Sequence, residues 1–232
     1  LAGEPMILRQ LERIARARWL DGIVVATSED PSDDELAVLL ADSGYNCIRG
    51  PLEDVLARYV QTLDEHQPDV VVRLTADCPL ISPQVIDLVV ERFHASSADY
   101  VSNTMNPTYP DGLDVEVMSA SILRTVGGEA VDPPEREHVT LGIYRQPERF
   151  SIEKVVDPSG LDRSEFRWTV DTAEDFDFVS EVYAALFPRE FEYEDVLRLL
   201  ERRPDLVRTD RDAPRNAALD GLDTGVMKRD VP

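Results

Sequence analysis

Lysine, cysteine and long apolar runs are scarce in this sequence. Only Lys154 and Lys228 occur among 232 residues, so arginine carries nearly all of the positive charge. The two cysteines, Cys47 and Cys78, have neither metal-ligand spacing nor a disulfide framework, and they suit a reducing compartment. No run approaches the roughly 18 apolar residues of a membrane helix, and the first residues lack a secretory signal pattern. We therefore expect a cytoplasmic protein without a membrane span.

Acidic residues strongly outnumber basic ones. Asp and Glu total 46 against 24 Lys and Arg, which gives a net charge of −22. Such a charge repels nucleic acids and acidic membrane surfaces, so neither is expected as a partner. An anionic substrate would need a local positive patch or a metal ion to bind. Hydrophobic residues make up 43% of the chain, enough for the core of one large α/β domain.

Hydrophobic periodicity alternates between helical and strand-like segments over much of the chain. Helices are predicted at residues 6–19, 33–42, 52–65, 83–93, after Ser119, at 136–144, 173–187 and 193–202. Strands are predicted at 22–27, 46–49, 70–74, 100–103, 113–118, 150–156 and 167–170. Ser32 with Glu35 predicts a capping box, and Ser82 predicts an N-cap. The β-α-β-α order indicates an α/β fold with a mostly parallel sheet and helices on both faces.

Two parts of the chain depart from this alternation. Residues 105–165 contain turn signals and irregular spacing, and are interpreted as an inserted subdomain that walls the site. Residues 208–232 are rich in Asp, Arg, Pro and Gly, and are interpreted as a flexible acidic tail. The main domain is accordingly predicted to cover residues 1–207.

Two aspartates follow predicted strands. Asp77 comes after the strand at 70–74, and Asp171 comes after the strand at 167–170. Ligands of open α/β sheets bind at the carboxyl ends of strands, so both carboxylates are placed to hold one Mg²⁺ with phosphate oxygens. The structural alternatives are that Asp77 only accepts bonds from loop amides and that Asp171 only caps a helix.

Several stretches together resemble the cytidylyltransferase family that includes CMP-acylneuraminate and CMP-KDO synthetases, with the branch called spore coat polysaccharide biosynthesis protein F the most similar. The stretches are LAGEPMILRQLERI (1–14), ATSEDPSDDELA (26–37), RGPLEDVLARY (49–59), RLTADCPLISPQVID (73–87), YPDGLDVEVMS (109–119), EREHVTLGIY (135–144) and RWTVDTAEDF (167–176).

The resemblance implies a Rossmann-like nucleotidyltransferase fold and a set of site residues. Asp77 and Asp171 would be catalytic residues that bind Mg²⁺ together with the CTP phosphates. Nucleotide contacts are implied for Arg49, Ala76 and Asp77, although Arg49 is otherwise a surface arginine at a strand end.

Each residue that is expected to contact the substrate also has a purely structural interpretation. His138 aligns with a sugar-contacting position of the KDO branch, or is a structural histidine in a helix. Asp111, Gly112 and Asp114 would bond sugar hydroxyls or only build a turn. Arg73 and Arg167 would meet a phosphate or carboxylate, or pair with the site aspartates. The substrate-binding set is therefore His138, Asp111, Gly112, Asp114, Arg73 and Arg167.

The family opens with a strand and a loop of the type Arg-x-x-Ser-x-Arg-Leu-Pro-Gly-Lys, which wraps the triphosphate. This sequence begins at Leu1, where the family resumes after that loop. We therefore expect the first strand and the phosphate loop to be missing, through truncation or through loss of the loop. Truncation is the preferred explanation, because that strand would be central in the sheet.

The implied reaction couples CMP from CTP to an acidic, 2-keto-acid sugar with release of pyrophosphate, in polysaccharide or glycoconjugate biosynthesis. The resemblance also implies a homodimer formed through residues 105–165. Two alternatives stay open at this point: a glycosyltransferase that uses a nucleotide-sugar, and a non-catalytic nucleotide- or sugar-binding subunit.

Overall fold

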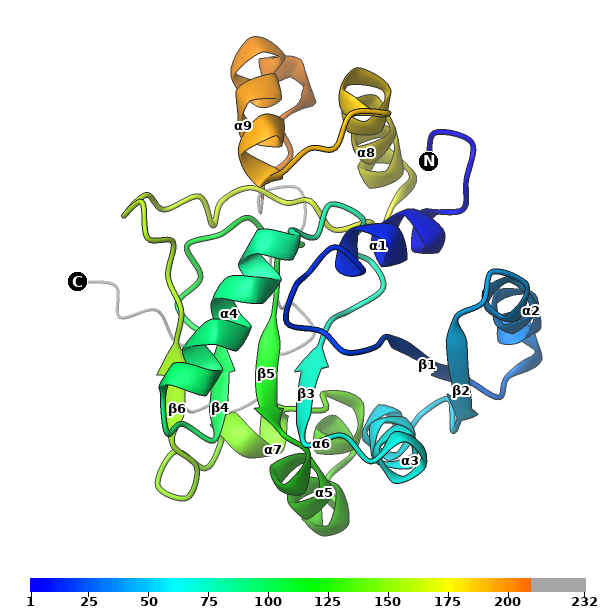
Figure 1. Cartoon of the computed structure of the whole chain (residues 1–232), viewed down its shortest axis with the longest axis vertical. Helices are drawn as coiled ribbons and strands as arrows, with labels where there is room; N and C mark the ends of the chain where they lie inside the picture. Colours follow the sequence, from blue (N-terminus) through cyan, green and yellow to red (C-terminus); the bar gives the residue numbers. More distant parts are fainter. Residues whose placement is uncertain (210–232) are drawn as a thin grey trace.

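Helices and strands alternate through the first half of the chain, as the periodicity predicts (Figure 1). The computed structural model describes residues 1–209. The strands are β1 (Val24–Ser28), β2 (Asn46–Gly50), β3 (Val70–Arg73), β4 (Tyr100–Ser102), β5 (Glu116–Ser119) and β6 (Ile152–Lys154). The helices are α1 (Met6–Ile14), α2 (Asp34–Asp42), α3 (Val55–His66), α4 (Pro83–Ala95), α5 (Ala120–Glu129), α6 (Pro133–Glu137), α7 (Leu141–Tyr144), α8 (Ala173–Leu186) and α9 (Tyr193–Arg202).

The strands form two sheets. One has the order β3-β5-β4-β6, in which β5 runs antiparallel to both neighbours and β4 pairs in parallel with β6. The other is the parallel pair β1-β2. Within residues 1–209 no ladder joins β1 to β3, so each keeps one unpaired edge. The continuous apolar runs at residues 22–27 and 70–74 are typical of buried strands. All four residues of β3 and the first three of β1 are instead half-buried, because neighbours cover only one edge.

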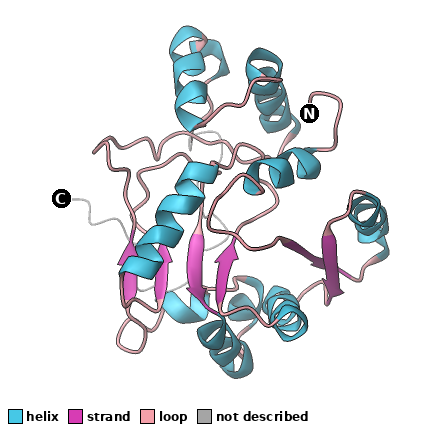
Figure 2. Cartoon of the chain, in the orientation of Figure 1, coloured by secondary structure: helices cyan, strands magenta, loops and turns pink. Residues whose placement is uncertain are grey.

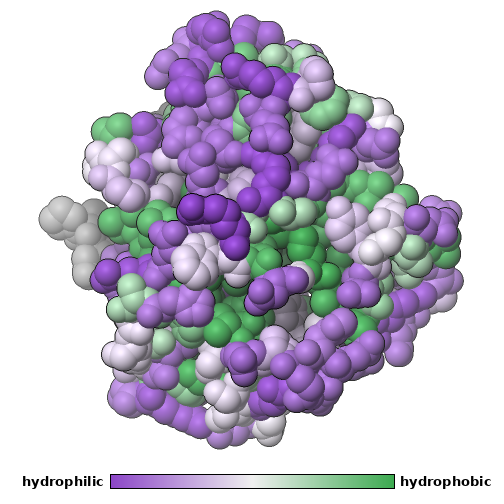
Figure 3. All heavy atoms as spheres, in the orientation of Figure 1, coloured by the Kyte–Doolittle hydropathy of each residue, from purple (hydrophilic) through white to green (hydrophobic). Residues whose placement is uncertain are grey.

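Helices cover both faces of the four-stranded sheet (Figure 2). Helix α4 packs on one face and belongs to the larger hydrophobic core, which also takes in α1, α8 and α9. Helices α3, α5 and α7 enclose a second, smaller core against the opposite face. Figure 3 shows hydrophobic residues at the surface in the middle of one side of the molecule, between α4 and the β1-β2 pair. The predicted α/β architecture with helices on both faces is confirmed.

Some predicted elements have different ends or a different form. Helix α1 ends at Ile14 instead of residue 19. The Ser32–Glu35 capping box is absent from this part of the structure, because a short 3-10 turn (Pro31–Asp33) precedes α2 and Asp30 caps that turn through the Ser32 N–H at 2.9 Å. Residues 167–170 form only an isolated bridge, between Arg167 and Asp111, and not a strand.

The segment 105–165 is built into the main sheet. It contributes β5, which lies between β3 and β4, and β6 at the sheet edge, while α5 to α7 cover one face. The expected helix over 136–144 is divided into α6 and α7 around His138. Residues 105–165 are therefore continuous with the main domain, although they were interpreted as an inserted subdomain.

Residues 208 and 209, directly after the predicted main domain, pair with residues 166 and 167. The Arg167 N–H donates to the Arg208 carbonyl at 3.0 Å, and Thr209 bridges to Phe166. The predicted flexible tail otherwise lies outside the described residues. None of the helices in the described part of the chain is both long and apolar enough to cross a membrane.

Candidate active site

The loop after β3 and the segment before α8 meet at the predicted site. Asp77 follows the last residue of β3 by four positions and is half-buried, while Ala76 beside it is exposed. The backbone N–H of Val170 donates to the Asp77 carbonyl at 2.9 Å. This bond joins two segments nearly a hundred residues apart and brings the chain at Asp77 next to the chain at Asp171. The two backbone segments are thus adjacent, while a shared site of the two carboxylates stays a prediction.

The carboxylate of Asp171 is exposed but held in one orientation. Its side chain is 60% exposed, and Arg167 donates from Nη2 to its Oδ2 at 2.5 Å. Arg167 itself is only 4% exposed and also pairs with Asp175 at 2.7 Å. The guanidinium predicted to meet substrate is therefore engaged by two carboxylates of its own chain, which was the competing interpretation of Arg167.

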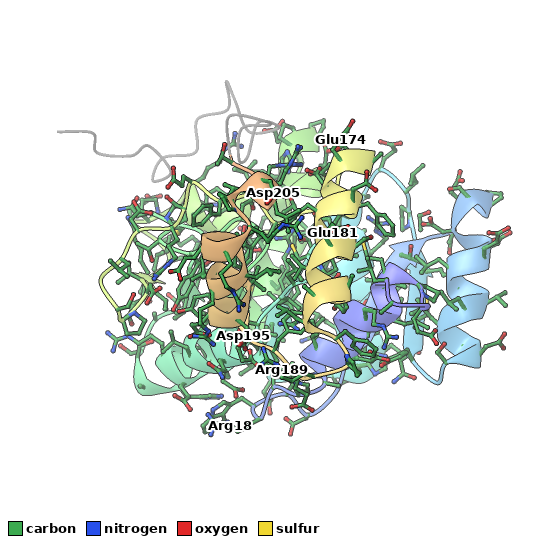
Figure 4. All side chains as sticks on the ribbon, turned by 90° about the horizontal axis from the view of Figure 1, so that it is seen from above. Arg18, Glu174, Glu181, Arg189, Asp195 and Asp205 are labelled. Carbon is green, nitrogen blue, oxygen red and sulfur yellow. The ribbon has the colours of Figure 1, made fainter. Side chains whose placement is uncertain are left out.

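Asp175 is a site-supporting residue that the sequence interpretation missed. It is fully buried and accepts hydrogen bonds from the N–H groups of Asp171 and Thr172 and from the Thr172 hydroxyl. Burial alone would raise its pKa, but these hydrogen bonds and the Arg167 charge outweigh burial and lower the pKa. Asp175 completes a capping box with Thr172 at the start of α8, the end marked by Glu174 in Figure 4. The Thr-x-x-Asp spacing was the available signal.

The negative charges of Asp77 and Asp114 act on the thiol of Cys78. The buried thiol donates to Asp77 Oδ1 at 3.3 Å. Burial, followed by the charges of Asp77 and Asp114, raises the pKa of Cys78 well above its usual range. A thiol that keeps its proton is a poor nucleophile. The charge of Asp114 thus acts on the same thiol as that of Asp77, and the protonated Cys78 has a packing role.

The two aspartates fit Mg²⁺ only in combination with a nucleotide. Residues 1–209 contain no group of three or more His, Cys, Asp or Glu side chains arranged to hold a metal ion. Mg²⁺ is usually held by one or two protein carboxylates together with waters and substrate phosphates. Asp77 and Asp171 match that pattern, and the phosphates of a bound nucleotide would supply the remaining ligands. Arg167 competes for the Asp171 carboxylate until such a ligand arrives.

Asp111 and Gly112 build the turn that supports this segment. The Asp111 N–H donates to the Phe166 carbonyl at 2.9 Å, and the Trp168 N–H donates to the Asp111 carbonyl at 2.8 Å. Gly112 has a φ of +102°, and a Cβ at this position would lie 2.9 Å from the Trp168 carbonyl carbon. Backbone cannot give way as a flexible side chain can. The structure therefore supports the turn-building interpretation for Gly112.

We expect Gly112→Ala to lower the free energy of unfolding by about 2 kcal/mol or more, because it combines a positive φ with a backbone clash. Thermal or urea unfolding measures the change. Gly128→Ala is the matched control, since Gly128 lies in α5 with no atom within 4 Å of its added Cβ. A stable Gly112→Ala protein would show that the turn adapts and would remove this explanation for the glycine.

Arg49 braces a loop of the smaller sheet. It donates to the Ser28 carbonyl at 2.8 Å and the Asp30 carbonyl at 3.0 Å, and pairs with Asp34 at 2.7 Å. These contacts hold the segment after β1. In the described chain the structure does not bring Arg49 to Asp77, because Arg49 belongs to the separate β1-β2 pair. Its predicted nucleotide contact stays a prediction.

Arg73 and His138 lie on another side of the site. Arg73 is the last residue of β3 and forms an ion pair with Glu116, directly opposite it on β5. His138 ends α6 and is half-buried, and its carbonyl accepts from the Leu141 N–H at 2.7 Å. Arg73 thus pairs with neither site aspartate, in contrast to the competing interpretation of that arginine. The sequence interpretation also missed Glu116, although an acidic residue between Val115 and Val117 in an apolar strand was a signal.

Comparisons with known proteins agree on one family. A family model described as cytidylyltransferase matches residues 1–210. The spore coat polysaccharide biosynthesis protein SpsF of Bacillus subtilis is 30% identical over 195 residues, covering 83% of this chain and 80% of that protein. The structure of a cytidylyltransferase from Leptospira borgpetersenii superposes with a TM-score of 0.83 at 27% identity, over 88% of this chain and 86% of that chain.

A more distant structure supports the same fold. CMP:2-keto-3-deoxy-manno-octonic acid synthetase in complex with CTP gives a TM-score of 0.59 at 15% identity, over 80% of this chain and 90% of that chain. The match to the family model spans every described element, and the SpsF relative covers most of both chains. The chain therefore belongs to the cytidylyltransferase family, the enzymes that transfer a cytidylyl group from CTP.

Proposed function

We propose that this enzyme couples CMP from CTP to an acidic sugar of the 2-keto-acid type and releases pyrophosphate, for surface polysaccharide or glycoconjugate synthesis. The observation that supports the proposal is the Val170–Asp77 backbone bond, which joins the segment that carries Asp171 to the loop after β3 that carries Asp77. The names of the SpsF protein and of the octonic acid synthetase support polysaccharide synthesis and an acidic sugar substrate.

The proposed chemistry is a displacement at the α-phosphorus of CTP. An oxygen of the sugar hydroxyl attacks the α-phosphorus, the bond from that phosphorus to the bridging oxygen breaks, and pyrophosphate leaves. The hydroxyl proton passes to a base that the structure does not identify. Asp77 and Asp171 would hold Mg²⁺, which when bound neutralises charge on the phosphate oxygens. The protein's own part is positioning and preorganised electrostatics.

The strongly acidic chain makes such neutralisation necessary. With a net charge of −22, the protein repels both CTP and a sugar acid at long range. A metal ion at Asp77 and Asp171 and a guanidinium toward the sugar would reverse the sign of the charge locally. We further expect the enzyme to act in the cytoplasm and, from its family, as a homodimer through residues 105–165.

Pyrophosphate release tests the proposal. The protein expressed from the full-length reading frame would be incubated with Mg²⁺, each of the four nucleoside triphosphates and a panel of 2-keto-acid sugars. We expect release that needs CTP and one acidic sugar together. Equal release with all four triphosphates would contradict the cytidylyl assignment. Release of a nucleoside diphosphate from a nucleotide-sugar, with no pyrophosphate from CTP, would favour a glycosyltransferase.

A further inference from the structure

A buried polar cluster lies beside the site and has no part in the metal-binding scheme. Glu116 on β5 accepts from Arg73, from the Tyr100 hydroxyl and, at 2.6 Å, from the Thr140 hydroxyl. The Arg73 guanidinium lies 6.0 Å from the centre of the Tyr59 ring. We call these five residues the Glu116 cluster. They come from β3, β4, β5, α3 and the segment between α6 and α7, so several elements converge on one carboxylate.

The cluster joins two chain segments that carry predicted site residues. Arg73 ends β3, four residues before Asp77, and Thr140 lies two residues after His138. Cross-strand pairing sets Arg73 directly opposite Glu116, on the sheet face covered by α3, α5 and α7. The side chains that Glu116 orients therefore belong to the same two chain segments that carry Asp77 and His138.

Stability alone does not explain a charged pair at this position. Its surroundings are the apolar side chains of the smaller core, among them Met118 and Leu141. Removing two charges from water costs several kcal/mol per ion, and well-packed apolar residues often stabilise such a place equally well. Burial would raise the pKa of Glu116, but the Arg73 charge and the Thr140 and Tyr100 hydroxyls outweigh burial and lower the pKa. Glu116 is thus maintained as an anion that fixes Arg73.

The cluster opens toward solvent at Arg73. The Glu116 side chain is 6% exposed, whereas the Arg73 side chain is 21% exposed. A guanidinium has five N–H donors, and Glu116 accepts from the one amino group Nη1. Within residues 1–209 the Nε of Arg73 is buried and has no hydrogen-bond partner, so a ligand does not reach this atom in the structure. Because Nε is buried, the amino groups are the part of this planar guanidinium that would donate hydrogen bonds to a substrate carboxylate.

We propose that Glu116 is a positioning residue that holds Arg73 to receive the carboxylate of the acidic sugar. This inference rests on the proposed function for the identity of the substrate. Beyond the proposed function, it states that selection of a sugar acid over its uncharged form depends on Arg73 and on the Glu116 carboxylate that pairs with it. Tyr100 and Thr140 donate to Oε1 of Glu116, which leaves Oε2 for Arg73.

The test compares 2-keto-acid sugars with their methyl esters in the full-length protein. In steady-state kinetics, Glu116→Gln should raise the KM for the acid about tenfold or more, because a charged hydrogen bond is misaligned, while the KM for CTP changes less than about twofold. Arg73→Gln should abolish the preference for acid over ester, and Arg73→Lys should restore part of it. Glu153→Gln is the matched control, since Glu153 on β6 pairs with Arg92 on α4, outside the Glu116 cluster.

Equilibrium binding separates this inference from the proposed reaction. Calorimetric titration of the same acids and esters needs no turnover. Acid-selective binding that is lost in Glu116→Gln supports the inference even when no pyrophosphate is released. Wild-type protein that binds acid and ester equally, or binds neither, overturns it. A Glu116→Gln protein that melts earlier but keeps full acid selectivity also overturns it, because Glu116 would then only support the fold.

Discussion

Asp77→Asn should lower kcat/KM for CTP-dependent pyrophosphate release about a thousandfold. The substitution keeps the shape of the side chain and removes the charge that would hold Mg²⁺. Charge stabilisation by a bound metal is worth several kcal/mol, and each 1.36 kcal/mol is a factor of ten in rate. Stability should change little, because within residues 1–209 the Asp77 carboxylate accepts only the weak S–H bond of Cys78. Asp171→Asn should act in the same direction.

The binding of Mn²⁺ is a second property by which the same variants are compared. In the presence of CTP, electron paramagnetic resonance should show Mn²⁺ bound to the wild type and bound more weakly to Asp77→Asn. Asp177→Asn is the matched control, because Asp177 is exposed on α8 close to the site in sequence. An Asp77→Asn protein with more than about a tenth of wild-type activity would remove Asp77 from the metal site.

Asp175→Asn should lower the free energy of unfolding by about 3–5 kcal/mol. Asp175 is fully buried and pairs with both Arg167 and Arg208, and removing one member of a buried pair leaves uncompensated charge. The same substitution weakens the start of α8 and releases Arg167, which orients Asp171. We therefore expect loss of activity together with loss of stability. Urea unfolding beside Asp177→Asn measures the difference.

The pH dependence of that difference has a definite sign. The folded-state pKa of Asp175 lies below that of an unfolded aspartate, which is about 3.9. Its contribution to stability is thus fully present above that value and is lost as the pH falls through the lower, folded-state pKa. The gap between wild type and Asp175→Asn should narrow in acid. A gap that is constant down to the lowest accessible pH would mean that charge pairing is not its cause.

Helical periodicity and N-cap residues predicted most of the helices, because both act between residues close in the sequence. Helix α9 begins and ends where the periodicity placed it, at Tyr193 and Arg202, and Ser82 and Ser119 cap the helices that follow them. The sequence failed where tertiary contacts decide. It did not predict that residues 105–165 insert β5 into the middle of the sheet, or that β1-β2 stands apart from β3. Such pairings depend on contacts distant in sequence.

The site shows the same division. Position after two apolar segments predicted that the chain at Asp77 and the chain at Asp171 are neighbours, and the Val170–Asp77 bond joins these segments although residues 167–170 form no strand. The ion pair of Arg167 with Asp171 was one of the alternatives that the sequence offered. The pairs of Arg167 with Asp175 and of Arg73 with Glu116 were not predicted, because they depend on side-chain contacts made in the folded chain. The structure, and not the sequence, therefore identified the supporting carboxylates of Asp175 and Glu116.

The most direct test of the account follows the α-phosphate of CTP. With CTP labelled at that phosphate, Mg²⁺ and the accepted acidic sugar, the label should appear in a CMP-sugar, in equal amount to unlabelled pyrophosphate, and Asp77→Asn should form almost none. Label that stays in CTP, or that passes only to free cytidine nucleotides with no labelled sugar, would contradict cytidylyl transfer at this site.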